Sequence, residues 1–189
     1  ELFAALFTFA FAASITPGPN NAMLLASGAN FGLKRTLPHM VGVALGGVIM
    51  VLGVGLGLGV VLHAFPQLYV AVEVVGGVYL LYLAYKIATA RGIGAASGAG
   101  HPMTFWEAAA FQWVNPKAWA GAVGAIAAFA PEQGYFFNVV VVALVFLAIS
   151  VPVVTLWTSM GAGLRRFLDR PRVLRAFNLT MAALLVAAL

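Results

Sequence analysis

The chain has 189 residues, of which 63% are hydrophobic and 8% are charged, and its formal net charge is +5. Soluble domains carry about 25% charged residues, so this chain has too few to cover a surface that faces water. The composition therefore excludes a soluble domain and a nucleic-acid partner, and it indicates a protein of the lipid bilayer. Cysteine is absent, which excludes disulfides and thiol catalysis.

Six apolar segments are long enough to be membrane-spanning helices, since a helix needs roughly 20 residues to cross the bilayer core. The sequence therefore predicts an all-α membrane protein with six transmembrane helices. The predicted spans are residues 2–27, 39–62, 67–85, 105–130, 135–160 and 173–189.

The first predicted helix is interrupted by the run Pro17, Gly18, Pro19, Asn20, Asn21. No water reaches backbone groups freed by proline in lipid, so such a break persists only where protein or a wet cavity covers it. Pro19 can begin a second half-helix, because the first turn does not need its missing N–H. Gly18 lets a ligand approach the backbone closely, while Asn20 and Asn21 add hydrogen-bond donors and acceptors.

The third predicted helix contains Glu73, the only acid well inside a span. Ionisable residues within membrane helices are costly and usually functional. We expect Glu73 to bind a substrate ammonium group, to carry a coupling proton, or to pair with Lys117. The alternative is that its side chain extends to the outer surface of the membrane.

The longest non-apolar stretch, residues 86–103, is rich in glycine and predicts a flexible cytoplasmic linker. It divides the chain into a first three-helix repeat (1–85), the linker (86–104) and a second three-helix repeat (105–189). An odd number of spans in each half places the halves in opposite orientations, so a shared fold would make them an inverted repeat.

The fourth predicted helix is interrupted at Asn115, Pro116 and Lys117. Pro116 can begin an outward half-helix, and Asn115 adds a polar side chain at the break. A lysine in the bilayer costs roughly 2.5–3.5 kcal/mol, so Lys117 should face a cavity or a partner. We expect it to neutralise a substrate carboxylate, to pair with an acid or to lose its proton during transport; the alternative is a packing role between helices.

The two breaks occupy corresponding places in the two halves. Pro17 and Pro116 each lie about fifteen residues from the outer end of their helix, which puts both near the bilayer midplane at 1.5 Å per residue. Paired breaks of this kind are the best sequence pointer to the binding site of a transporter. Two half-helix N-termini that face one cavity would suit an anionic group such as a carboxylate. The alternative is a pair of structural kinks.

The basic residues predict the orientation of the chain. All lysines and arginines except Lys117 lie in the first, third and fifth loops or, for Arg175, at the border of the fifth loop, and the second and fourth loops contain none. Cytoplasmic loops carry an excess of lysine and arginine. The odd-numbered loops are therefore expected in the cytoplasm, and both termini outside.

Three ordered motifs carry a resemblance to a known family: ITPGPN at 15–20, GGVYLLYL at 76–83 and NPKAW at 115–119. Together they resemble the lysine exporter and threonine/homoserine exporter (LysE/RhtB) family of amino-acid efflux proteins. The resemblance implies a bacterial inner-membrane protein with six helices in an inverted repeat. It also implies export of amino acids or close derivatives in exchange for protons, and it is compatible with a homodimer. Glu73 stands where the family pattern would lead us to expect a basic residue. The family's preference for the charge of its substrate is therefore not carried over to this chain.

Other functions remain as alternatives. An exporter of metal or other ions would need several carboxylates or thiols, and Glu73 is the one acid deep in a span. An intramembrane hydrolase would need a nucleophile with a base or two aspartates, but Asp169 is the only Asp. The sequence thus predicts neither an enzyme nor a metal or cofactor site. A passive channel would equilibrate its substrate without accumulating it.

Overall fold

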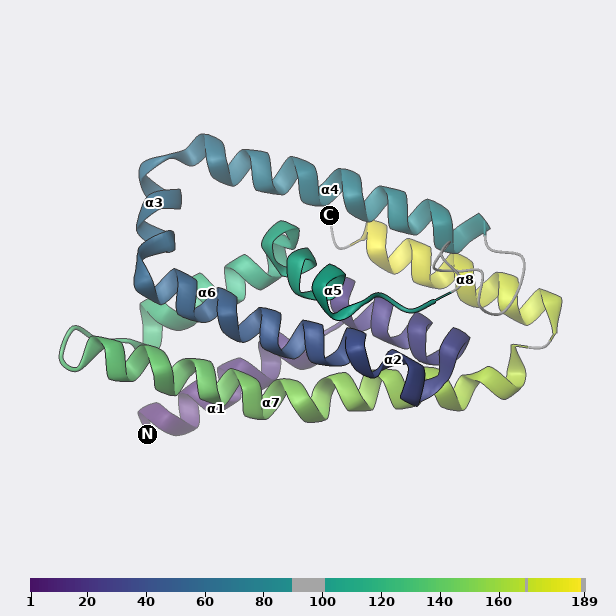
Figure 1. The fold of residues 1–189 in the computed structure, drawn as a ribbon, viewed down its shortest axis with the longest axis horizontal. Helices are drawn as coiled ribbons and strands as arrows, with labels where there is room; N and C mark the ends of the chain where they lie inside the picture. Colours follow the sequence, from purple (N-terminus) through teal and green to yellow (C-terminus); the bar gives the residue numbers. More distant parts are fainter. Residues whose placement is uncertain (90–100, 169, 188–189) are drawn as a thin grey trace.

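The computed structural model describes residues 1–89, 101–168 and 170–187, and all regular secondary structure in these residues is helical (Figure 1). Most of the predicted linker, including Arg91, lies outside the described residues. The helices are α1 (Leu2–Ile15), α2 (Pro19–Gly53), α3 (Gly59–Ala64), α4 (Pro66–Thr89), α5 (Phe105–Phe111), α6 (Pro116–Phe129), α7 (Tyr135–Leu164) and α8 (Pro171–Val186). A π-helical stretch, Val54–Leu58, joins α2 to α3, and short 3-10 turns, Gln112–Val114 and Arg165–Phe167, follow α5 and α7.

Helix α2 consists of two limbs, a first limb (residues 19–31) and a second limb (residues 33–53). Gly32 between them has φ 78° and ψ 169°, a left-handed φ that favours glycine, and the chain reverses direction there. The hydroxyl groups of Ser27 and Thr36 hydrogen-bond across the reversal at 3.0 Å. The sequence predicted a loop of some ten residues at this point, and this prediction was wrong because one glycine suffices for the turn.

The helical character predicted from the sequence is confirmed. Three helical stretches are long and apolar enough to cross a membrane, Pro19–Val61, Val70–Thr89 and Tyr135–Phe167, and α1 is a shorter apolar helix. The breaks also lie where proline predicted them, since α1 ends at Ile15 before Pro19 begins α2, and Pro116 begins α6. The second predicted span differs, because Gly57 (φ 118°) bends the chain before α3.

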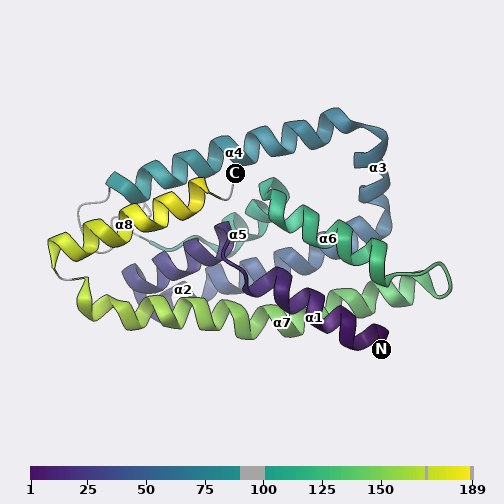
Figure 2. The ribbon, with the colours of Figure 1, turned by 180° about the vertical axis from the view of Figure 1, so that it is seen from behind.

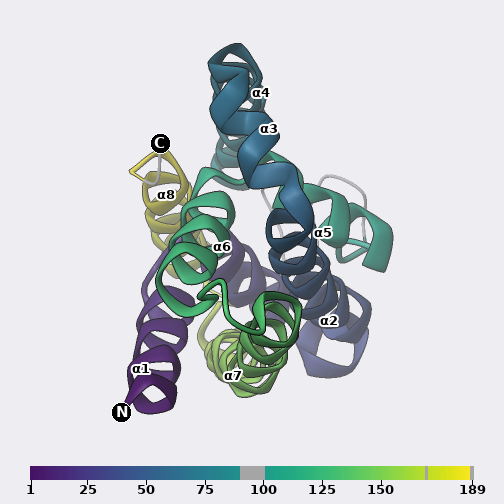
Figure 3. The ribbon, with the colours of Figure 1, turned by 90° about the vertical axis from the view of Figure 1, so that its left-hand side faces the viewer.

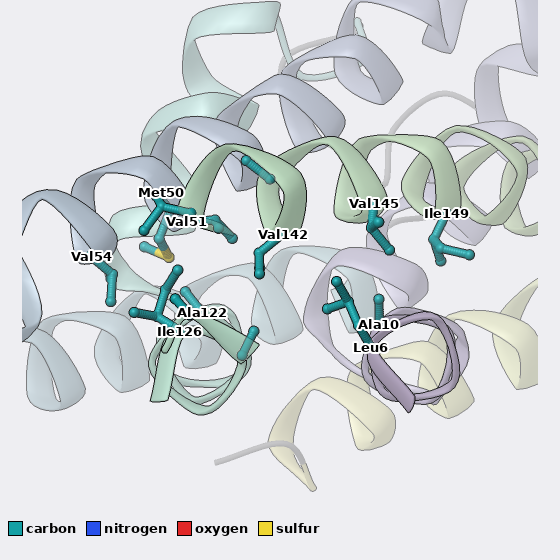
Figure 4. Close-up of a cluster of buried hydrophobic side chains, with 14 of the residues drawn as sticks. Leu6, Ala10, Met50, Val51, Val54, Ala122, Ile126, Val142, Val145 and Ile149 are labelled. Atoms are coloured by element: carbon teal, nitrogen blue, oxygen red, sulfur yellow. The ribbon is translucent and has the colours of Figure 1, made fainter. Parts of the chain in front are cut away.

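Helix α7 holds the two halves of the chain together. Its apolar side chains pack against α1, the second limb of α2 and α6 in one buried cluster (Figure 4). Near its other end, α7 crosses the first limb of α2 at two glycines. A Cβ at Gly28 would clash with the backbone of Thr158, and a Cβ at Gly161 would clash with that of Leu25. Backbone contact this close is the usual consequence of small residues in membrane helices.

The basic segments gather at one end of the molecule. The reversal at Gly32, the C-terminus of α4 and the α7–α8 junction all lie there, at the right of Figure 1 and the left of Figure 2. Figure 3 shows the opposite end, with the N-terminus, α3 and the α6–α7 turn. Large apolar side chains are exposed along the helices between these ends, including Val78, Leu144 and Leu156. Such a surface suits contact with lipid.

Candidate functional site

The break between α1 and α2 is stabilised by its own side chains. Thr16 and Gly18 have extended backbones, so the last carbonyl groups of α1 have no helical partner. Buried Asn21 donates hydrogen bonds from Nδ2 to the carbonyl oxygens of Ser14 (2.8 Å) and Thr16 (2.9 Å). The asparagine side chain thus replaces helical hydrogen bonds lost at the break.

The break before α6 is built in the same way. Buried Asn115 caps α6, because its Oδ1 accepts a hydrogen bond from the backbone N–H of Lys117 at 3.1 Å. The indole Nε1 of Trp119 donates to the carbonyl oxygen of Trp113 at 2.9 Å. Each interruption is therefore stabilised by hydrogen bonds between its side chains and its backbone.

Lys117 connects the two breaks. Its Nζ donates to the carbonyl oxygen of Thr16 (2.7 Å), the hydroxyl oxygen of Thr16 (2.9 Å) and the carbonyl oxygen of Pro17 (3.2 Å). An ammonium group has three hydrogens to donate, so these contacts satisfy it. They also place a positive charge at the C-terminus of α1, where the helix dipole favours a cation. Residues about a hundred positions apart in the chain thus meet at one point.

A pair of side-chain amides forms a second connection between the breaks. Asn20 Nδ2 donates to Gln112 Oε1 at 2.8 Å, and Gln112 Nε2 donates back to Asn20 Oδ1 at 3.1 Å. Gln112 also donates to the carbonyl oxygen of Ala108 at 2.9 Å. The pair joins the first limb of α2 to the end of α5, so both broken helices are fixed to each other by polar contacts.

A central cavity of about 110 Å³ lies beside these contacts, bordered by α1, both limbs of α2, α6 and α7. A water molecule needs roughly 10–15 Å³ on the same measure, so the cavity has room for a small molecule of several heavy atoms. Five residues predicted from the sequence line it: Gly18, Asn20, Asn21, Asn115 and Lys117. The remaining lining is mostly apolar, apart from the amide of Gln112 and the hydroxyls of Ser14 and Ser150.

The other predicted residues lie outside this cavity lining. Pro17 is exposed and contributes its carbonyl oxygen to Lys117, while Pro19 and Pro116 begin the two half-helices. Glu73 is exposed on α4, and none of the described residues that line the cavity comes from α4. Lys117 is paired with carbonyl oxygens in this structure and not with Glu73. Within the described residues, no group of three or more acids and histidines is placed to hold a metal ion.

Comparison with known proteins shows to which family the chain belongs. The model of the family described as "LysE type translocator" matches residues 11–188, which include both breaks. The chain belongs to this family. A cysteine/O-acetylserine efflux protein of Escherichia coli (strain K12) is 32% identical over 154 residues, covering 78% of this chain and 75% of the relative. The protein of the same name from Salmonella typhimurium (strain LT2) is 29% identical over 151 residues, with the same shares covered. No solved structure matches the chain.

Sequence reasoning missed Gln112 in this LysE-type translocator. A signal was present, because Gln112 is a lone amide in an apolar segment three residues before the Asn115 break. Polar side chains inside membrane segments face partners or cavities. The partner itself, Asn20, lies 92 residues away and could not be inferred from spacing.

The amide pair leads to a prediction for this translocator. Gln112→Leu should lower export about tenfold, because it leaves the Asn20 amide unpaired at the cavity and an unsatisfied polar group costs about 1–3 kcal/mol. Initial export rates from cells with matched expression would measure the effect. Gln133→Leu, in the exposed α6–α7 turn, is the control and should export at the wild-type rate. Unchanged export by Gln112→Leu would remove the amide pair from the site.

Proposed function

We propose that this translocator is a secondary active exporter of amino acids or close derivatives across the bacterial inner membrane. Its relatives are named for efflux of cysteine and O-acetylserine, which are small amino acids with an uncharged side chain at neutral pH. The central cavity has no acid among its described lining residues, and Lys117 is the one charged group there. A small neutral zwitterion fits this lining better than a cationic amino acid.

The observation that carries the proposal is the contact between Lys117 and the carbonyl groups of Thr16 and Pro17 at the cavity. A substrate carboxylate would compete with these carbonyls for the ammonium group of Lys117. Each carbonyl that Lys117 releases could then accept a hydrogen bond from the substrate's own ammonium group. The two breaks would thus supply matched partners for both ends of a zwitterion.

The amide groups would position the same substrate. Asn20 and Asn115 line the cavity at the starts of the two half-helices, where the helix dipoles also favour a carboxylate. Gly18 lies directly beside the side chain of Lys117. A Cβ atom at position 18 would be 2.8 Å from Cδ of Lys117 and 2.9 Å from Nζ of Lys117. A side chain at position 18 would therefore displace the lysine.

We further propose that six membrane spans form an inverted repeat of residues 1–85 and 105–189, joined by the linker 86–104. The 14-residue lengths of both α1 and α6 support this, since each then spans about 21 Å from the break to the same end of the molecule. The basic segments at the other end support cytoplasmic loops and external termini. Rocking of one repeat against the other would give alternating access.

Proton exchange would drive export in this proposal. Lys117 is the candidate at the cavity, since displacement from the carbonyls of Thr16 and Pro17 would change its surroundings during the cycle. Glu73 remains the candidate named from the sequence. Because it is exposed on α4, it would act in coupling only if a second copy of the chain packed on that face in a homodimer.

Uptake of labelled O-acetyl-L-serine into inside-out membrane vesicles tests the function. The expected result is accumulation inside the vesicles above the external concentration when respiration supplies a proton gradient. An uncoupler should abolish that accumulation, and vesicles without the protein should show none. Uptake that only reaches equality of the two concentrations, with or without the uncoupler, would indicate a passive channel and contradict the proposal.

A further inference from the structure

A second cavity, of about 210 Å³, lies toward the basic end of the molecule. We call it the basic-end cavity; its lining comes from the first limb of α2, α4, the segment before α5 and α5 itself, together with His39 of the second limb. Its lining shares no residue with that of the central cavity, so the two cavities are separate. The first limb of α2 borders both cavities, with Asn20 and Asn21 lining one and Met23 and Ser27 lining the other.

His39 is a buried polar residue in the lining of this cavity. Its side chain is 1% exposed, and neither of its ring nitrogens has a hydrogen-bond partner among the residues that the structure describes. Buried polar atoms in native proteins are nearly always hydrogen-bonded, and an unsatisfied one costs about 1–3 kcal/mol. An imidazole kept unpaired against a cavity indicates that its partner is a molecule that enters that cavity.

Two opposite charges border the same space. Lys86 from α4 lines it, with Nζ 4.6 Å from the ring centre of Tyr82, and Glu107 from α5 lines it as well. The Oε2 atom of Glu107 accepts hydrogen bonds from Thr104 N (2.7 Å) and Thr104 Oγ1 (2.9 Å). No ion pair of Lys86 or Glu107 occurs within the part of the chain that the structure describes, so both charges can face a ligand.

We infer that the basic-end cavity is a second binding site for a small zwitterionic amino acid. The ligand's ammonium group would face Glu107, its carboxylate would face Lys86, and one of its polar groups would complete the hydrogen bonding of His39. The site would take substrate from the side of the basic segments before it reaches the central cavity. Its ligand class rests on the proposed export function.

The variants that test this site can keep the fold intact. Glutamine also completes a capping box, so Glu107→Gln removes the charge and retains the cap of α5. His39→Leu replaces an unsatisfied imidazole with an apolar side chain, and its thermal unfolding midpoint should equal or exceed that of the wild type. Glu132→Gln, which removes an acid from the exposed α6–α7 turn, is the matched control.

Equilibrium dialysis of the purified protein with labelled O-acetyl-L-serine counts the sites. Two bound molecules per chain are expected for the wild type and Glu132→Gln, and one for Glu107→Gln and His39→Leu. Gln112→Leu should weaken the other, central site. Wild-type binding by both Glu107→Gln and His39→Leu, or no binding by the wild type, would overturn the second site. A single wild-type site that only Gln112→Leu weakens would also overturn it, yet leave the export proposal standing; failure of vesicle accumulation would instead count against export.

Discussion

Lys117→Met is expected to lower the export rate by roughly tenfold to a hundredfold. The substitution keeps most of the aliphatic side chain but removes the ammonium group that contacts Thr16 and Pro17 at the cavity. Hydrogen bonds of a charged group contribute about 1.5–3 kcal/mol, and each 1.4 kcal/mol corresponds to about a factor of ten. Counterflow of labelled O-acetyl-L-serine in proteoliposomes would measure the loss.

The fold should survive this substitution. Thr16 keeps a hydrogen bond from Asn21, and the cost of holding a charge within the membrane disappears. The thermal unfolding midpoint of Lys117→Met in detergent should therefore stay within a few degrees of the wild type. Lys34→Met, at an exposed position near the start of the second limb of α2, is the control and should transport normally. Export by Lys117→Met at the wild-type rate would show that the lysine only packs the helices.

Gly161→Ala is expected to destabilise the protein by about 1–3 kcal/mol or more, the usual cost of overpacking. The added Cβ would clash with the carbonyl oxygen of Leu25 and lie 2.9 Å from the backbone nitrogen of Ala29. Backbone atoms inside a helix cannot move aside singly, so α7 and the first limb of α2 would have to separate. The first limb carries Asn20 and Asn21, and its displacement should also lower export.

Gly163→Ala provides the matched control for this crossing. Gly163 lies on the same helix, and a Cβ there would meet nothing within 4 Å. Alanine favours helix over glycine by about 1 kcal/mol, so this variant should be at least as stable as the wild type. Denaturation by sodium dodecyl sulfate, followed by circular dichroism, compares the two variants. Equal midpoints for Gly161→Ala and Gly163→Ala would contradict the close crossing.

The breaks were predictable from the sequence because proline in an apolar run has a local physical consequence. Pro19 and Pro116 each begin a helix in the structure as expected. The start of the second helix was not predictable in the same way. Lys34 and Arg35 indicated a loop by their charge, yet both favour helix, and the second limb of α2 already includes them.

The partners across the breaks could not be predicted. Asn20 meets Gln112, and Lys117 meets Thr16, only because tertiary packing brings the half-helices together. The pattern of apolar residues also did not show which face of each helix packs against its neighbours, because a membrane helix is apolar on the face that contacts lipid as well as on the face that packs. The sequence around Glu73 therefore did not decide between a site in the cavity and a position outside it, and the structure places Glu73 exposed on α4, away from the central cavity.

Substrate protection of single cysteines tests most directly whether the two breaks enclose the substrate site. The chain has no native cysteine, and both Gly47 and Gly121 line the central cavity with open space at their Cβ positions. Gly47→Cys and Gly121→Cys should react with N-ethylmaleimide in membranes, and O-acetyl-L-serine should slow both reactions several-fold. Gly163→Cys, outside the cavity, should react at the same rate with or without substrate. Equal rates with and without substrate at all three positions would contradict a binding site between the broken helices.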